Sequence, residues 1–208
     1  MAASPSDPSA SDPLAEIKTN LRRAAKARRT AAAAEAPDAG EGLCQALLAA
    51  VTFPKDVAVS AYWPMRDEID PLPAMRALHA RGHPVALPVM TGKDRPLIFR
   101  AWHPDQELVD GGFGTKMPPA DAPEVQPQIL LAPMLAFDGA GYRLGYGGGF
   151  YDRTLAKLRG LNSLTRGVGL AFAGQRVEAL PRGRYDQPLD MIVTESGMAV
   201  DMASGGRS

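Results

Sequence analysis

ILLAPMLAFDGAGYRLGYGGGFYDRTLAKLRG, residues 129–160, contains the elements that decide the fold. It opens with ILLAP (129–133), a short apolar run without polar alternation, which is typical of a central strand covered on both faces. A glycine-rich stretch follows, and FYDRTLAKLRG (150–160) then shows helical spacing through Tyr151, Leu155 and Leu158, with Gly160 as a stop signal. A buried strand, a glycine loop and a helix in this order indicate an α/β fold with a ligand site beyond the carboxyl end of the strand.

The segments around this stretch predict the same fold class. DVAVSAYW (56–63) and HPVALPVM (83–90) predict strands, and between them Asp70 and Pro71 begin a helix that Gly82 ends. Strand, helix and strand within roughly thirty residues form a βαβ unit, which requires parallel pairing. We predict further helices over 13–35 and from Pro37 to before Phe53, strands at 97–102, 166–173, 191–195 and 197–200, and a long surface loop from Asp110 to Pro127. The expected fold is a three-layer α/β/α domain around a central, mostly parallel mixed sheet.

Length and composition indicate one domain. The chain has 208 residues, of which 45% are hydrophobic and 22% charged, as in an ordinary globular protein, and we expect a single domain over 13–201. Residues 1–12 are rich in Ala, Ser, Pro and Asp without a basic start or an apolar core, so they predict a disordered tail rather than a signal or transit peptide. We expect a second flexible tail over 202–208.

Charge and cysteine content exclude several classes of protein. The 23 Lys and Arg residues balance 23 Asp and Glu residues, so no general positive field attracts nucleic acid or an anionic membrane. The longest apolar run, ILLAPMLAF (129–137), is too short to span a bilayer. The single cysteine, Cys44, predicts a small buried helix residue and a reducing compartment. We therefore expect a soluble cytoplasmic monomer that binds neither nucleic acid nor membrane.

The stretch RLGYGGGFYDR (143–153) is the strongest candidate for a ligand site. Its glycines, at 145 and 147–149, lack side chains and accept positive φ, so their backbone N–H groups can converge on a phosphate. The following helix N-terminus adds partial positive charge, and Arg143 can add a bidentate fork. The pattern is neither a P-loop nor a dinucleotide fingerprint. Because glycine loops also serve as plain tight turns, spacing alone leaves both interpretations open.

Acidic and basic residues elsewhere complete the candidate set. Asp152 follows the glycines, and Asp186 lies in the polar loop PRGRYDQPLD (181–190); one or two carboxylates together with phosphate oxygens suit Mg²⁺. In the first predicted helix, steps of three and four place four basic residues on one face, for which a solvated surface is the simpler interpretation. These residues are Lys18, Arg22, Lys26 and Arg29. The three histidines, His79, His83 and His103, lie outside every motif and predict structural or surface roles.

Together these residues resemble a known family. APMLAFDGAGYRLGYGGGFYDRTL (132–155) is similar to the signature of the 5-formyltetrahydrofolate cyclo-ligases, also called 5,10-methenyltetrahydrofolate synthetases. EIKTNLR (16–22), YWPMRDEID (62–70) and YDQPLDMIVTE (185–195) fit the same family in order. The resemblance implies a three-layer α/β fold and a ring closure that uses ATP and Mg²⁺. In that reaction 5-formyltetrahydrofolate becomes 5,10-methenyltetrahydrofolate through a phosphorylated formyl group, an iminium phosphate, and ADP and phosphate are released.

The resemblance also implies a role for each candidate. Lys18 and Arg22 contact ATP phosphates, whereas Lys26 and Arg29 remain solvent-facing. Trp63 and Glu68 contact the folate, where a carboxylate accepts hydrogen bonds from the amino-pyrimidine edge of the pterin. Asp152 and Asp186 ligate the metal. ATP is assigned to Arg143, Leu144, Gly145, Tyr146, Gly147, Gly148, Gly149, Phe150 and Tyr151, of which Tyr146 to Phe150 also border the folate and Arg143 and Tyr151 are catalytic.

Two other functions stay open at this point. One is a family member without ligase activity that binds nucleotide or RNA, although the balanced charge argues against an RNA surface. The other is an ATP-dependent enzyme that acts on a different small amide.

Overall fold

The computed structural model describes residues 13–112 and 114–202, so the tail predicted for 1–12 and all but Met202 of the tail predicted for 202–208 lie outside the described residues. The helices are α1 (Pro13–Glu35), α2 (Ala39–Ala50), α3 (Leu72–Ala80), α4 (Phe150–Leu161) and the 3₁₀ turn η1 (Ala173–Gln175). The strands are β1 (Val59–Ser60), β2 (Val85–Val89), β3 (Ile98–Ala101), β4 (Val109–Gly112), β5 (Thr115–Met117), β6 (Ile129–Ala132), β7 (Ala136–Phe137), β8 (Arg143–Leu144), β9 (Arg166–Leu170), β10 (Met191–Thr194) and β11 (Gly197–Asp201).

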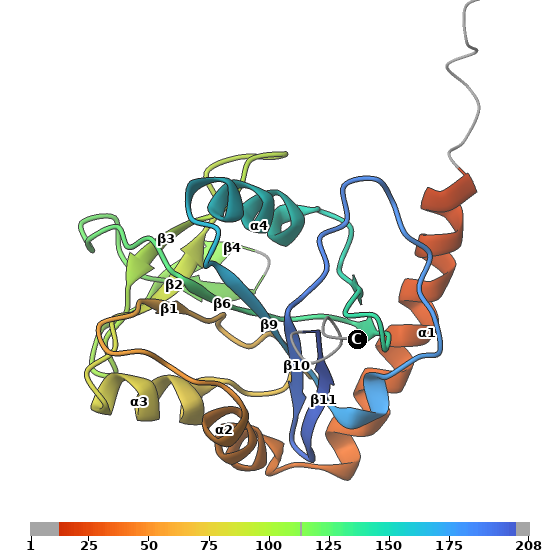
Figure 1. The fold of residues 1–208 in the computed structure, drawn as a ribbon, viewed down its shortest axis with the longest axis horizontal. Helices are drawn as coiled ribbons and strands as arrows, with labels where there is room; N and C mark the ends of the chain where they lie inside the picture. The colour runs from red at the N-terminus through yellow and green to blue at the C-terminus, as the bar shows by residue number, and fades with distance from the viewer. Residues whose placement is uncertain (1–12, 113, 203–208) are drawn as a thin grey trace, which may run out of the picture.

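The described residues form a central seven-stranded sheet in the order β11-β10-β9-β6-β1-β2-β3 (Figure 1). The inner strands β10, β9, β6, β1 and β2 pair in parallel, while β3 and β11 run antiparallel to their neighbours at the two edges. The predicted βαβ unit is therefore present as β1, α3 and β2. The predicted mixed, mostly parallel sheet is confirmed.

Helices cover both faces of the sheet. Figure 1 shows α2 and α3 on one face and α4 on the other, with α1 along the end of the molecule. Leu43 and Leu47 of α2 pack with Met75 and Leu78 of α3 in one core, and Leu155 of α4 belongs to the core on the opposite face. Because both faces are covered, every residue of β6 is buried, as its unbroken apolar run predicts.

Helix α1 buries fewer apolar side chains than α2, α3 or α4. Its fully buried residues are Ala25 and Arg29. Ala25 packs against Leu135, which precedes β7, and Leu144, which belongs to β8 in the small β7–β8 ladder. The turn of that ladder is fixed by Asp138, which is 1% exposed and accepts hydrogen bonds from the backbone N–H groups of Ala140, Tyr142 and Leu180. This ladder carries the chain from β6 to the glycines.

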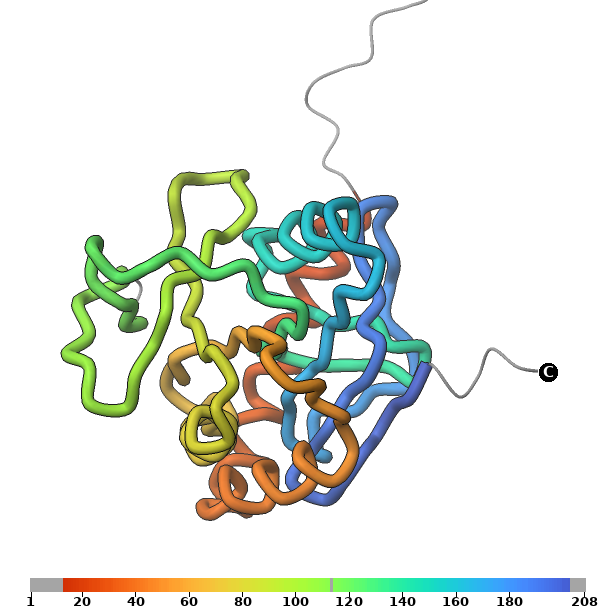
Figure 2. The backbone as a smooth tube through the Cα atoms, turned by 60° about the vertical axis from the view of Figure 1, so that its left-hand side comes forward, coloured from red at the N-terminus to blue at the C-terminus, as the bar shows by residue number. Residues whose placement is uncertain are grey.

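Three local predictions were wrong. The loop predicted from Asp110 to Pro127 contains the β4–β5 hairpin at the edge of the molecule (Figure 2), because glycines with positive φ at 112 and 114 supply its turn. The strand predicted over 56–63 is reduced to β1, since the chain leaves the sheet to line the cavity described below. Gly160 does not end α4, which continues to Leu161 and is capped by Asn162. Among the described residues, no helix combines the length and apolar character of a transmembrane span.

Candidate functional site

A cavity of ≈ 930 Å³ lies beyond the carboxyl ends of β1, β2 and β6. β1 and β6 are parallel neighbours, but the strands that follow them lie on opposite sides: β1 leads through α3 to β2, and β6 leads through α4 to β9. Such a switch point is where ligands bind in open α/β sheets, and the volume is within the range of about 300–1,000 Å³ for small-molecule sites. Helix α1 and the β4–β5 hairpin provide the remaining walls.

All predicted site residues line this one cavity. They come from α1, the loop after β1, the stretch from β8 through the glycines into the first turn of α4, and the loop before β10: Lys18, Arg22, Trp63, Glu68, Arg143, Leu144, Gly145, Tyr146, Gly147, Gly148, Gly149, Phe150, Tyr151, Asp152 and Asp186. The histidines are absent from its lining, and Cys44 is buried in α2, as predicted. Roles within the cavity follow from the contacts of each group.

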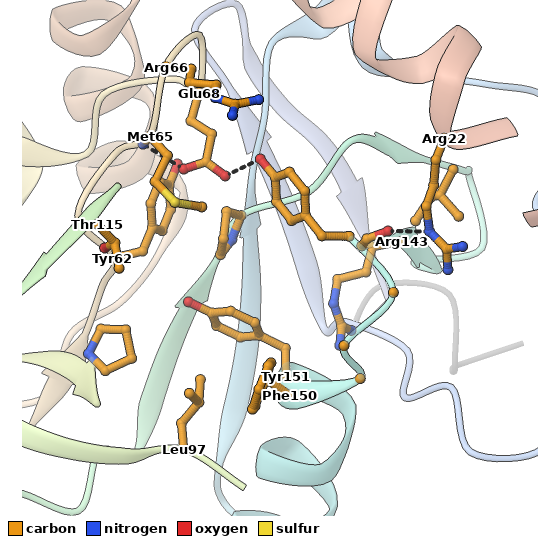
Figure 3. Close-up of a pocket in the computed structure, with 18 of the residues that line it drawn as sticks. Arg22, Tyr62, Met65, Arg66, Glu68, Leu97, Thr115, Arg143, Phe150 and Tyr151 are labelled. Carbon is orange, nitrogen blue, oxygen red and sulfur yellow. Dashed lines mark hydrogen bonds between the residues drawn. The ribbon is translucent and has the colours of Figure 1, made fainter. Parts of the chain in front are cut away.

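The glycine segment, residues 143–151, is held against α1. Gly147 has φ +105° and Gly149, the N-cap of α4, has φ +63°, so both adopt backbone conformations that favour glycine. Arg22 Nε donates to the carbonyl oxygen of Gly145 at 3.0 Å (Figure 3). A Cβ added to Gly147 would lie 3.3 Å from Arg22 Cζ, so the guanidinium packs directly on the bare backbone. The predicted cation and the predicted loop are thus in contact.

The two predicted metal ligands are each paired with a predicted cation. Lys18 Nζ lies 2.5 Å from Asp186 Oδ2, and Arg143 Nη2 donates to Asp152 Oδ1 at 2.8 Å. Asp152 Oδ1 also accepts the backbone N–H of Gln187 at 3.0 Å, so these contacts engage one oxygen of each carboxylate. The side chains of Asp152 and Asp186 are 26% and 25% exposed, and both face the cavity. In the described part of the chain no group of three or more His, Cys, Asp or Glu residues could hold a metal. Two carboxylates with a second oxygen each still fit an ion that brings phosphate oxygens with it.

Arg143 and Tyr151 differ in what they offer the cavity. The Arg143 side chain is 4% exposed and donates from Nη1 to the carbonyl oxygen of Gln187 at 2.8 Å, so its fork is already used by the protein. Burial lowers the pKa of Arg143, and Asp152 partly offsets this effect. Tyr151 directs its hydroxyl into the cavity (Figure 3). Burial, followed by the charge of Glu68, raises the pKa of this phenol, so it remains a proton-bearing donor at neutral pH.

Glu68 is the buried carboxylate of the site, at 8% exposure. Its Oε2 accepts the backbone N–H of Met65 at 2.9 Å, and its Oε1 accepts the hydroxyl of Tyr146 (Figure 3). Burial raises the pKa of Glu68, and these hydrogen bonds and the charge of Arg29 oppose the rise. On the other wall, Trp63 lies beneath the ammonium of Lys116, which is 6.0 Å from the ring centroid.

Arg29 corrects a prediction from the sequence. It was expected to face solvent, but it is 3% exposed. Its Nη2 lies 2.5 Å from Asp67 Oδ1, and its Nη1 donates to the Tyr146 hydroxyl. The physical reason is that this part of α1 faces the loop after β1 instead of water. The signal was present in the basic stripe, because Arg29 continues the face that carries Lys18 and Arg22. Lys26 is exposed at the rim of the cavity, as predicted.

Comparisons with known proteins support one family. A model described as the 5-formyltetrahydrofolate cyclo-ligase family matches residues 15–195. The 5-formyltetrahydrofolate cyclo-ligase of Escherichia coli (strain K12) is 37% identical over 160 residues, covering 73% of this chain and 87% of the relative. The Haemophilus influenzae protein of the same name is 32% identical over 184 residues, covering 86% and 96%. An NMR structure of Aquifex aeolicus 5,10-methenyltetrahydrofolate synthetase matches with a TM-score of 0.76 at 30% identity, covering 92% of this chain and 95% of that one.

Proposed function

The chain belongs to the 5-formyltetrahydrofolate cyclo-ligase family and is a ligase, and we propose that in this cavity it converts 5-formyltetrahydrofolate into 5,10-methenyltetrahydrofolate with consumption of ATP and Mg²⁺. The observation that carries the proposal is the convergence of every predicted site residue, from four separate segments, on one cavity. Because every wall comes from one chain, we propose that a monomer suffices.

The cavity divides into two chemically different ends. Lys18 and Arg22 lie beside the glycine segment and the two aspartates, which suits a polyphosphate. Trp63 and Glu68 lie on the loop after β1 and both line the cavity, so they offer a flat ring and a carboxylate to a pterin. We therefore assign ATP to the end at α1 and α4 and the folate to the end at β1. Tyr146 to Phe150 lie between the two ends and border both ligands.

The proposed chemistry explains why the site holds cations rather than a nucleophilic side chain. A formamide oxygen is a poor leaving group, so the formyl oxygen attacks the γ-phosphorus, the bond to ADP breaks, and an iminium phosphate forms. Nitrogen 10 then adds to the formyl carbon and closes the ring, its proton is released, and phosphate leaves with the former formyl oxygen. Both steps depend on alignment and on neutralisation of phosphate charge.

The residues of this chain have separate tasks in these steps. Lys18 and Arg22 neutralise charge on the phosphates, and the backbone N–H groups of the glycine segment orient them. Tyr151, whose phenol keeps its proton, donates a hydrogen bond to oxygen at the reacting end. Arg143, at the start of the glycine segment, holds Asp152 in place and adds a fixed positive charge. Asp152 and Asp186 would hold Mg²⁺, which supplies further charge neutralisation when bound.

A direct assay tests the proposal. Purified protein is mixed with MgATP and 5-formyltetrahydrofolate, and the near-ultraviolet band of the methenyl product is followed together with ADP release. We expect equal amounts of both products, and neither without folate or without Mg²⁺. Absence of folate-dependent ADP release contradicts the proposal. ADP release with another small amide, but not with the folate, contradicts the assignment of the substrate.

A further inference from the structure

We propose that Arg29 is a positioning residue for folate recognition: acting through Tyr146, it orients Glu68 toward the hydrogen-bond donors of the pterin. The inference deepens the proposed function and rests on it, because it takes Glu68 as the folate contact. Arg29 is absent from the residues that the family resemblance implies, and the contacts around its side chain carry the argument.

The direction of the hydrogen bonds is fixed by chemistry. A guanidinium has donors and no acceptor, so the Tyr146 hydroxyl must accept the hydrogen bond from Arg29 Nη1. The hydroxyl has one proton, and it donates this proton to Glu68 Oε1. The chain of donors therefore runs from Arg29 through Tyr146 to Glu68. Without Arg29, the Tyr146 hydroxyl would lose the donor that holds its oxygen in place beside Glu68.

Glu68 is thereby left as an acceptor on both oxygens. Oε1 takes the Tyr146 proton, and Oε2 takes the backbone N–H of Met65 at 2.9 Å. Each carboxylate oxygen can accept a further hydrogen bond. The 2-amino group and the adjacent ring N–H of a pterin are two parallel donors, which match a carboxylate held in one orientation. Fixing the rotation of Glu68 thus determines whether both bonds form together.

Arg29 also separates two neighbouring carboxylates. Its Nη2 lies 2.5 Å from Asp67 Oδ1, and its Nη1 lies 3.7 Å from Glu68 Oε1. Asp67 Oδ2 accepts the Thr30 hydroxyl at 2.5 Å, so one turn of α1 holds both carboxylate oxygens of Asp67. Without the guanidinium, Asp67 and Glu68 would face each other in a partly buried site and turn apart.

Burial of the Arg29 side chain lowers the stability of the fold in one respect, which indicates that the residue is kept for another reason. Its Nε atom is buried and has no hydrogen-bond partner among the described residues. An unpaired buried polar group is unfavourable, and sequences tolerate such local conflicts mainly at functional sites. A lysine or a methionine at this position would avoid the unpaired nitrogen but would lose the two-sided contact.

The test compares binding of the two ligands separately. Equilibrium binding of 5-formyltetrahydrofolate without ATP, and of MgATP without folate, is measured for the wild type and for Arg29→Met, Arg29→Lys and Tyr146→Phe. We expect Arg29→Met to weaken folate binding about tenfold or more, because hydrogen bonds to a charged group are lost. MgATP binding should change less than about twofold, since Arg22 lies roughly 10 Å away along the helix. Arg29→Lys should restore part of the folate affinity.

Two further variants exclude a merely structural effect. Arg23→Met changes an exposed arginine of the same helix and should leave both affinities unchanged. Combined with Tyr146→Phe, Arg29→Met should add little, because the two residues act in series. Tyr146→Phe removes a single hydroxyl, so it tests the same link if Arg29→Met fails to fold.

Several results overturn the inference. Folate affinity unchanged in Arg29→Met, an equal loss of both ligands, or fully additive effects with Tyr146→Phe would each do so. The proposed function fails separately: a wild type that binds folate but releases no folate-dependent ADP contradicts the reaction and leaves the Arg29 comparison intact. A wild type that binds no folate contradicts both.

Discussion

Replacing Gly147 by alanine tests whether the glycine segment and Arg22 form a phosphate site together. Gly147 has φ +105°, a conformation that L-residues rarely adopt. The added Cβ would lie 3.3 Å from Arg22 Cζ and 3.4 Å from Arg22 Nη2. The substitution therefore acts in two ways: it strains the backbone, and it presses on a cation assigned to ATP.

The two effects differ in size and in assay. Backbone strain of this kind costs about 1–3 kcal/mol, and each kcal/mol lowers Tm by about 2–4 °C in a chain of this size. Displacement of Arg22 removes its 3.0 Å hydrogen bond to the Gly145 carbonyl and moves the charge away from the phosphates. Losing one charge-assisted contact corresponds to about a tenfold higher KM for ATP. Thermal unfolding measures the first effect, and initial rates at varied MgATP measure the second.

Gly82→Ala is the matched control. Gly82 has φ +85° and no atom within 4 Å of an added Cβ, and it follows the end of α3, outside the cavity lining. It should lower Tm by a similar amount and leave the KM for ATP unchanged. If Gly147→Ala lowers Tm but keeps wild-type affinity for ATP, the assignment of Arg22 and Gly147 to the phosphates is refuted.

Three further predictions follow from the contacts of single side chains. Arg143→Lys should lower kcat/KM by about tenfold or more with little change in Tm, because one ammonium cannot reach both Asp152 and the Gln187 carbonyl. Unchanged steady-state kinetics would contradict a role of Arg143 in the site. Burial raises the pKa of Glu68, so folate should bind with full affinity above that pKa and more weakly as the pH falls through it, at a higher pH than for an exposed glutamate. Binding isotherms at varied pH should show this loss of affinity in the wild type and not in Glu68→Gln. If the loss persists in Glu68→Gln, Glu68 is not its source. Asp138→Ala should destabilise the fold by about 3 kcal/mol, or about 6–12 °C in Tm, because three backbone N–H groups lose their acceptor; calorimetry showing a wild-type Tm would contradict this account.

The central sheet was predictable from short-range patterns, whereas the separate β4–β5 hairpin and the length of β1 were not. The unbroken apolar run of β6 required a strand covered on both faces, and the strand, helix and strand over 56–90 required parallel pairing. The β4–β5 hairpin has no apolar alternation, and its glycines are equally typical of a loop. The length of β1 depends on where the chain leaves the sheet, which the cavity decides rather than local propensity.

The residues that line the candidate site were predictable where chemistry is concentrated in one stretch. The glycine segment carries its own signal, and family resemblance added Lys18, Arg22 and Glu68 from distant segments. Arg29 was misplaced because the basic stripe shows that Arg29 shares a helix face with Lys18 and Arg22, but not what that face contacts. Its partners are 38 and 117 positions away in sequence, so only the packing of α1 against both loops reveals them.

The attachment of α1 links the two ends of the cavity. Few of its side chains are buried, and three of its polar contacts to the body involve site residues: Lys18 to Asp186, Arg22 to Gly145, and Arg29 to Asp67. A fourth, from Arg28 to the Arg176 carbonyl, lies outside the cavity. A polyphosphate that recruits Lys18 and Arg22 would replace contacts that now hold the N-terminal half of the helix. The half that orients Glu68 keeps its own anchors in Asp67 and Tyr146. Under the proposed function, the helix would exchange its partners at the phosphate end while Asp67 and Tyr146 hold the folate end, which suits a reaction between two separately bound substrates.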